Sequence, residues 1–471
     1  MKIKKNKNTY ICMILNQSCM EELLHYVWKH KIFPLRPLQT TDGRAVEVIN
    51  PGLHNHDAGP DFFNASVRIA GQLWVGNVEI HLKASDWFRH HHDSDPAYAN
   101  VILHVVAQAD MDVPYPSAGD GRQELIPQLQ LEIPASVTDN YDQLVRSDRS
   151  PRCADIIPSL PPLMIHSWMS ALLAERLELR MQQINERREA CSMNWEDSLF
   201  ITVARTFGFG INGDAFEAWA KSLPMGAVAK HRDSLFQIEA LFFGQAGLLD
   251  TPPASPSSEE READEAYLLK LRKEYGYLRH KFGLVPIDGQ RWRFHRLRPQ
   301  NFPHIRIAQL AMLYYEQRVS LSQIVNIKDR DGLATLFKTH VSDFWQTHYT
   351  FQSNLSEAVP RSMSPATVSV VLLNAVAPFL FTYGRYKGDE ALCEQALELM
   401  EGERAEENSI VRTWAEAGIA CQSAADSQAL IQLTRYYCEP HKCLRCRFGC
   451  DFIRRTPGFL KEEESTDPTT L

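Results

Sequence analysis

Two short strings in the first hundred residues carry side chains that could do chemistry together. Asp61 follows Gly59-Pro60, and Glu79, His81 and Lys83 alternate with apolar residues a short distance later. Alternate side chains of a strand share a face, so these three are predicted to point one way. Asp61 comes within reach of Glu79 if the two segments pair antiparallel. Two converging carboxylates favour Mg²⁺ or Mn²⁺, and a nearby histidine or lysine could orient water or stabilise a charged phosphate, as phosphodiester hydrolysis requires.

The hydrophobic pattern predicts the elements that must position these residues. A helix is expected over residues 20–31, where apolar residues recur at helical spacing before two prolines. Four strands are expected, over residues 45–49, 62–69, 73–82 and 100–107, with a polar connecting segment that has helical character before the last. The predicted order is therefore helix, three strands, connecting segment, strand, in an α/β N-terminal domain.

This order, with Pro60-Asp61 and Glu79-Ile80-His81, resembles the PD-(D/E)XK nuclease superfamily over roughly residues 18 to 110. The resemblance implies a restriction-endonuclease-like αβββαβ core and a nuclease that depends on Mg²⁺ or Mn²⁺ and acts on DNA or RNA. Asp61 and Glu79 would bind the ion, and His81 or Lys83 would act on the water or the phosphate.

The resemblance also implies an assisting glutamate on the first helix, for which we choose Glu22 over the neighbouring Glu21. Two features depart from the superfamily pattern, because histidine stands at the usual lysine position and Lys83 comes two residues late. A nucleic-acid-binding protein that keeps this fold without catalysis is therefore an alternative.

Longer strings resemble a second, uncharacterised bacterial family of unknown function. They are GPDFFNA, GNVEIHLKASDW and CLRCRFG, and the resemblance covers most of the chain from about Met20. It implies no activity. It suggests that Met20 is the natural start and that the lysine-rich residues before it are an extension.

Histidines are concentrated near the N-terminus and allow other interpretations. A transition-metal hydrolase on another substrate would use His54, His56, His81 and His90 as ligands. His90 or His91 could alternatively join Asp93 or Asp95 as extra ligands or bases, and His104 is expected to be a core residue. The structural alternative is a solvated sheet face with no site.

Four cysteines near the C-terminus form the second candidate site: Cys438, Cys443, Cys446 and Cys450. Their spacing is compact enough to surround one metal, and we expect zinc or an iron–sulfur cluster, with free buried cysteines as the alternative. His441 could replace the last of them, and Cys153 could complete the set from a distance. Unpaired spacing of the other cysteines fits a reducing compartment.

The chain of 471 residues is 44% hydrophobic with a net charge of -8, which indicates several folded domains and excludes wholesale disorder. After an α/β domain over 18–150, long amphipathic stretches predict helical domains over 151–250 and 266–437. Between them, 251–265 is expected to be a linker or surface loop; 438–450 holds the cysteines, and 461–471 is expected to be a flexible tail. We find no secretory signal or membrane span in the sequence and predict a cytoplasmic protein.

A basic stretch stands out against the acidic total. Residues 266–306 carry ten Lys and Arg against two Asp and Glu, with aromatic residues between them. This composition is typical of nucleic-acid binding, in which basic groups contact the backbone and aromatic rings stack on bases. The candidate contacts are Arg291, Arg293, Arg296 and Arg298. The alternative is a solvated helix face with the first two arginines on the exposed side of a strand.

Overall fold

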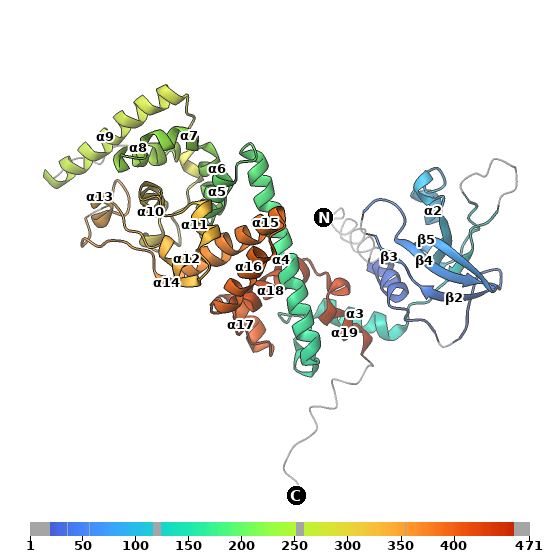
Figure 1. The fold of residues 1–471 in the computed structure, drawn as a ribbon. Coiled ribbons are helices and arrows are strands. Elements are labelled where there is room, and N and C mark those ends of the chain that lie inside the picture. Colours follow the sequence, from blue (N-terminus) through green and yellow to red (C-terminus); the bar gives the residue numbers. More distant parts are fainter. Residues whose placement is uncertain are drawn as a thin grey trace, which may run out of the picture. The chain divides into compact units, whose positions relative to one another are not determined.

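The computed structural model of the chain describes residues 19–34, 36–55, 57–115, 124–250, 259–353 and 355–455, and only the backbone of residues 259–264. The chain forms two compact units (Figure 1). The first contains the residues up to Pro161 together with those from Thr434 onward, and the second contains Pro162–Leu433. The cysteine-rich segment therefore belongs to the same unit as Asp61 and Glu79. The predicted tail over 461–471 and the segment before residue 19 lie outside the described residues.

A mixed β-sheet forms the centre of the first unit, with its described strands in the order β1-β2-β4-β5-β6-β7 and β3 paired to β4. Strands β2, β4 and β5 pair antiparallel, whereas β6 runs parallel to β5 and β7 parallel to β6. The strand bounds are β1 Leu38–Gln39, β2 Ala45–Asn50, β3 Leu53–His54, β4 Phe62–Ile69, β5 Gln72–Lys83, β6 Val101–Gln108 and β7 Gln128–Gln130. This confirms a sheet in the N-terminal region, and the four predicted strands lie at the expected places.

Local sequence explains the central hairpin. Ala70 and Gly71 join β4 to β5, and both have positive φ values, 49° and 85°, which a tight two-residue turn requires. Phe62, at the start of β4, faces Val78 across the hairpin. The described helix of residues 19–29 packs its apolar face, including the fully buried Trp28, into the same unit.

Residues 84–98 cover one face of β5. They form a single helical turn, α2 (Asp86–Arg89), and a short 3-10 turn (Pro96–Tyr98), so little of this connecting segment is helical. Trp87 and Tyr98 from these turns are buried with the start of β6. Residues 78–81 are consequently buried on both faces of β5, rather than on the apolar face alone.

The C-terminal segment returns to the first unit. Helix α19 (Arg447–Arg454) lies beside α3 (Ala135–Arg146), as Figure 1 shows. The Asn140 side chain donates to the carbonyls of Ile453 and Arg455 at 3.0 and 2.6 Å, and the Tyr26 hydroxyl donates to the Cys450 carbonyl at 2.9 Å. Side-chain bonds to backbone carbonyls therefore fix this segment against elements from the other end of the chain.

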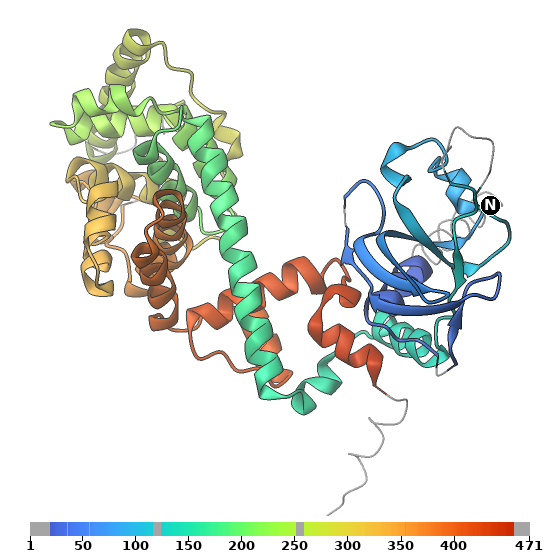
Figure 2. The same cartoon turned by 45° about the vertical axis from the view of Figure 1, so that its right-hand side comes forward.

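The second unit is helical, and α4 is its long green helix in Figures 1 and 2. This confirms the predicted mostly helical region after the sheet. Its described helices are α4 Pro162–Ala190, α5 Trp195–Phe207, α6 Gly213–Ser222, α7 Met225–Val228, α8 Leu235–Gln245, α9 Glu259–Phe282, α10 Pro303–Tyr315, α11 Leu321–Asn326, α12 Arg330–Leu336, α13 Asp343–Thr347, α14 Pro365–Val371, α15 Ala377–Lys387, α16 Glu390–Gly402, α17 Ser409–Glu416 and α18 Ala424–Leu433.

The stretch predicted as a linker, 251–265, differs from the expectation in its described part. Residues 251–258 lie outside the described residues, and helix α9 already begins at Glu259. The acidic residues that suggested a solvated loop are good helix formers, and acidic groups are favourable near a helix N-terminus.

One helical stretch of the described residues, Pro365–Lys387, is long and apolar enough to cross a membrane. It consists of α14, a π-helical turn and α15, and 61% of its most apolar window is buried inside the protein. Burial of this kind is typical of the core helix of a soluble protein.

A buried carboxyl group gives the helical unit a pH dependence. The Tyr267 hydroxyl and the Ser342 hydroxyl donate to the two oxygens of Glu239 at 2.6 and 2.7 Å. Burial raises the pKa of Glu239 from 4.5 to about 7, although both hydrogen bonds lower it. The folded chain therefore holds a proton that the unfolded chain releases at lower pH.

We predict that this stabilising contribution is fully present below about pH 4.5 and is lost as pH rises through 7. The change is about 3 kcal/mol at most. Urea unfolding at pH 5 and pH 8 should show a smaller loss in Glu239→Gln than in the wild type. Glu178→Gln, at an exposed position of α4, should behave like the wild type. An equal loss in Glu239→Gln and the wild type would contradict the prediction.

Candidate active site

Asp61 and Glu79 approach each other closely at the start of β4. Asp61 directly precedes β4, and Glu79 follows Val78, the β5 partner of Phe62. The Asp61 backbone N–H donates to Glu79 Oε2 at 3.1 Å, and the Ile80 backbone N–H donates to Asp61 Oδ2 at 2.9 Å. The two bonds link each carboxylate to the strand that carries the other. The antiparallel pairing expected from the sequence therefore brings the two acids together.

Burial makes it costly for Asp61 and Glu79 to carry negative charge at the same time. Glu79 is only 4% exposed. Burial and then the neighbouring charge of Asp61 raise the pKa of Glu79 well above its usual range, while the Asp61 N–H and His25 lower it. Two close carboxylates are costly in a poorly solvated site unless a cation or a proton compensates them.

The first helix contributes His25 to the pair. His25 Nε2 lies 3.3 Å from Asp61 Oδ2. Burial lowers the pKa of His25. The hydrogen bond to Asp61 and the charges of Asp61, Glu21 and Glu79 raise it by a larger amount, so the net shift is upward. His25 can therefore hold a proton next to Asp61. Glu21, whose pKa burial raises, shares this environment, whereas Glu22 is exposed.

His81 lies one alternate position beyond Glu79 and is 1% exposed. Its Nε2 atom is 3.4 Å from Glu79 Oε1 and 3.2 Å from His90 Nδ1, and its Nδ1 atom is 2.9 Å from His104 Nε2. Burial, and then the surrounding histidines, lower the pKa of His81 strongly. His81 is therefore neutral near pH 7. It offers a lone pair, not the positive charge of the lysine that it replaces.

His90 and His92 come from the segment that covers β5. The ligand atoms of His81, His90 and His92 all lie within 4.8 Å of one another. His92 Nε2 also lies 3.3 Å from Glu79 Oε1. Burial lowers the pKa of both covering histidines. The arrangement supplies neutral imidazoles and a carboxylate, which is a metal-binding set of donors.

The comparisons with known proteins identify a family but no activity. A family model described as "Protein of unknown function (DUF2851)" matches residues 21–409. The chain belongs to the DUF2851 family. This confirms the expected membership of an uncharacterised family over most of the chain. No curated protein and no solved structure matches the chain.

The other predicted site residues lie outside the group formed by His81, His90 and His92. Lys83 is exposed at the end of β5, and its backbone N–H donates to Asp86 Oδ2 at 3.3 Å. His54 stacks on Phe62 with ring centroids 4.6 Å apart and lies edge-on to His25, so it does not join the His81 group. His56 lies outside the described residues.

A small pocket of about 220 Å³ adjoins the first helix, and His25 is part of its lining. Three basic side chains, Lys29, Lys442 and Arg445, line the same pocket together with Glu22. The cysteine-rich segment therefore supplies basic groups to a cavity that reaches the histidine beside Asp61. A phosphate group fits the charge of this lining.

Cys153 lies close enough to three thiols of the cysteine-rich segment to be influenced by them, but no three cysteine sulfur atoms among the described residues lie within 4.8 Å of one another. Burial, followed by the neighbouring thiols of Cys446, Cys438 and Cys443, raises the pKa of Cys153 well above its usual range. Burial and Cys446 raise the pKa of Cys443 to about 11 and that of Cys450 to about 12. Cys153, which is far away in the sequence, therefore shares the environment of the four clustered cysteines.

The basic stretch of the helical unit differs from the expected binding surface in two of its aromatic residues, whereas Tyr277 is 61% exposed. Trp292 is 5% exposed and donates from Nε1 to the Ala246 carbonyl at 2.7 Å, and Tyr275 is also buried. These two rings are core residues and are not available for base stacking.

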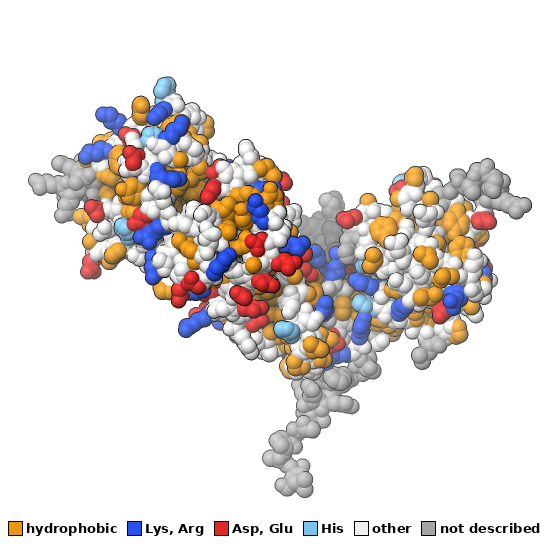
Figure 3. Space-filling view, in the orientation of Figure 1, with side chains coloured by type: hydrophobic (Ala, Val, Ile, Leu, Met, Phe, Trp, Pro, Cys, Tyr) orange, Lys and Arg blue, Asp and Glu red, His pale blue; other side chains and the backbone are white. Residues whose placement is uncertain are grey.

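Arg291 lies in a short 3-10 turn, not in a strand. The four candidate arginines are exposed, whereas Arg306 is buried over the Phe209 ring. On the face drawn in Figure 3, basic and acidic side chains are interspersed over the helical unit.

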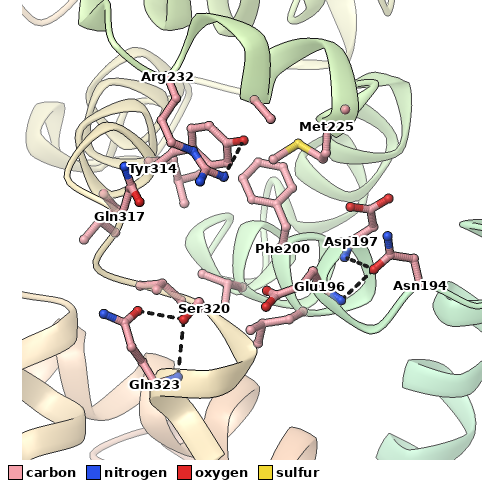
Figure 4. Close-up of a pocket in the computed structure, with 17 residues that line it drawn as sticks. Asn194, Glu196, Asp197, Phe200, Met225, Arg232, Tyr314, Gln317, Ser320 and Gln323 are labelled. Atoms are coloured by element: carbon pink, nitrogen blue, oxygen red, sulfur yellow. Dashed lines mark hydrogen bonds between the residues drawn. The ribbon is translucent and has the colours of Figure 1, made fainter.

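The helical unit also contains a larger cavity of about 640 Å³. Figure 4 shows Arg232 bonded to Tyr314, with Phe200 and Met225 nearby. The Glu196 carboxylate accepts from the Leu321 backbone N–H at 3.1 Å. Since Arg232 and Glu196 are already hydrogen-bonded, the carboxylate and histidine cluster of the first unit is the better candidate for catalysis.

Proposed function

We propose that this chain is a metal-dependent phosphodiester hydrolase that acts on nucleic acid, with Asp61 and Glu79 as its catalytic carboxylates. The observation that carries the proposal is the approach of these two acids across the β4–β5 hairpin. A divalent ion would compensate their charge. Mg²⁺ or Mn²⁺ is the ion expected for such a pair, and it would supply a water molecule of lowered pKa and neutralise charge on the phosphate.

The strand arrangement supports a restriction-endonuclease-like core for this site. A helix is followed by the antiparallel strands β2, β4 and β5 and then by β6, which is parallel to β5. This is the αβββαβ order, with the connecting helix reduced to α2. Asp61 opens the second of these strands and Glu79 lies in the third, as in PD-(D/E)XK nucleases.

The chain's own residues would divide the remaining work. His25 holds Asp61 in place and keeps a proton beside it. His81, being neutral, presents a lone pair toward Glu79. The basic pocket formed by Lys29, Lys442 and Arg445 would bind a phosphate of the strand near the catalytic pair. Arg291, Arg293, Arg296 and Arg298 would contribute backbone contacts without base stacking.

We predict that Asp61→Asn and Glu79→Gln each reduce the cleavage of DNA or RNA in Mg²⁺ or Mn²⁺ by about 100-fold or more, because each removes a charge that binds the ion. Gel assays with single-stranded and double-stranded substrates measure this effect. Asp57→Asn, at an exposed carboxylate of the same loop, should cleave at the wild-type rate.

Two outcomes would contradict the hydrolase. Full cleavage by the Asp61→Asn/Glu79→Gln double variant would remove these residues from catalysis. Salt-dependent binding of nucleic acid by the wild type without turnover in either ion would instead support a binding protein that has lost catalysis.

We also propose that the cysteine cluster binds zinc or an iron–sulfur cluster, drawing on Cys153, Cys438, Cys443, Cys446 and Cys450. Burial disfavours the thiolate form of these side chains, and a bound metal would reverse that cost. A metal bound by Cys153 and the C-terminal cysteines would then link the two segments of the chain that form the first unit.

We predict that the purified protein carries zinc, or iron with sulfide, in stoichiometric amount. Elemental analysis and broad visible absorbance distinguish the two. Cys443→Ser/Cys446→Ser should lose the metal, and Cys421→Ser, in the helical unit, should keep it. A wild-type protein without either metal, or the same metal content in the double variant as in the wild type, would contradict the site.

A further inference from the structure

Four potential ligand atoms from two segments meet beside Asp61. Glu79 and His81 lie two residues apart on β5, so they share a face of the strand. His90 ends α2, and His92 follows two residues later. The intervening His91 has a positive φ of 61° and is exposed, while His92 is buried. This left-handed residue turns the chain after α2, so that the histidines on either side of it reach the same group.

Three of the distances between these atoms match those of a coordination shell. His81 Nε2 lies 3.2 Å from His90 Nδ1 and 3.4 Å from Glu79 Oε1, and Glu79 Oε1 lies 3.3 Å from His92 Nε2. Ligands that bind a tetrahedral ion at about 2.0–2.1 Å lie about 3.3–3.4 Å from one another. These three contacts are close to the edges of such a tetrahedron. Glu79 lies outside the group of three histidines whose ligand atoms are all within 4.8 Å of one another, so its carboxylate would have to shift to complete the shell.

The rings are held in this orientation by their surroundings. His81 Nδ1 lies 2.9 Å from Nε2 of the fully buried His104, which fixes the His81 ring and leaves its Nε2 atom facing Glu79. His92 stacks on Tyr98 with ring centroids 3.8 Å apart and meets Trp87 edge-on. Partners of this kind orient ligating histidines in metal sites.

The types of ligand atom also indicate which metal ion the site would bind. Imidazole suits first-row transition metals, whereas Mg²⁺ prefers oxygen ligands and retains several water molecules. Three imidazoles with one carboxylate are therefore poorly suited to Mg²⁺. The shell therefore favours Fe²⁺ or Zn²⁺ most, and of the two ions expected for a carboxylate pair it suits the transition metal Mn²⁺ better than Mg²⁺.

We propose that Glu79, His81, His90 and His92 bind a single first-row transition metal ion, such as Mn²⁺, Fe²⁺ or Zn²⁺, in preference to Mg²⁺. The use of this ion in hydrolysis rests on the proposed function, but its binding does not. Glu79 would belong both to this shell and to the pair with Asp61, which places the ion next to the second carboxylate.

The test is a titration of the full-length protein with Mn²⁺, in which electron paramagnetic resonance measures the free ion. Mn²⁺ is chosen because thiolate ligands favour other metals, so the cysteine cluster contributes little. His90→Ala and His92→Ala should each weaken the Mn²⁺ affinity by about 10-fold or more, and a large excess of Mg²⁺ should displace the ion poorly.

His91→Ala is the matched control, because it removes the exposed histidine between the two ligands and should leave the affinity within about two-fold of the wild type. His90 is itself exposed, so its replacement is compatible with folding, which circular dichroism verifies. Equal affinity in the wild type, His90→Ala and His92→Ala would overturn the proposal, as would easy displacement by Mg²⁺ or no Mn²⁺ binding at all.

The two proposals fail differently. Tight Mn²⁺ binding that depends on His90 and His92, without cleavage of any nucleic acid, supports the metal site and contradicts the hydrolase. Cleavage in Mg²⁺ that is unchanged in His90→Ala and His92→Ala supports the hydrolase and contradicts the transition-metal site.

Discussion

The candidate site depends on two hydrogen bonds between the backbone and the carboxylates of Asp61 and Glu79. In each of them, a carboxylate accepts from a backbone N–H beside the other acid. The Asp61 N–H donates to Glu79, and the Ile80 N–H donates to Asp61, so neither carboxylate can move without breaking a hydrogen bond to the backbone beside the other acid. Two acids are thereby kept together where Glu79 is almost fully buried. Because water cannot screen them there, their environment has to supply positive charge or protons. His25 can supply a proton on one side of the pair. On the other side, His81, His90 and His92 offer ligands for a cation.

The neutral state of His81 connects this constraint to the proposed chemistry. A lysine at this position would bring a positive charge next to Glu79 but no lone pair, whereas a neutral imidazole offers a lone pair to a metal ion. The covering segment completes the arrangement, since it buries the face of β5 that carries Glu79 and His81 and adds His90 and His92 to it. The C-terminal cysteine segment extends the first unit further by lining the pocket that reaches His25. The helical unit contributes exposed arginines, but its Trp292 and Tyr275 are used in its own core.

The sequence predicted those features that follow from local patterns. Alternation and the turn at Gly71 located β4 and β5, and antiparallel pairing then placed Asp61 near Glu79. His25 was missed because the face of a helix that meets a sheet depends on tertiary packing, although its spacing of four residues from Glu21 puts both on one helix face. His92 was missed because a run of three histidines has no periodicity, and only the left-handed His91 brings its neighbours together. The density of basic residues around Trp292 gave no indication that the aromatic rings were buried, since composition does not record which side chains face the core.

The most direct measurement is a crystal structure of the protein loaded with Mn²⁺, with anomalous diffraction collected to locate the ion. We predict a strong Mn²⁺ anomalous peak within bonding distance of Glu79 Oε1, His81 Nε2, His90 Nδ1 and His92 Nε2, next to Asp61. Mn²⁺ bound elsewhere in the first unit instead, or no Mn²⁺ peak while the imidazoles of His81 and His90 remain in direct contact, would contradict the account.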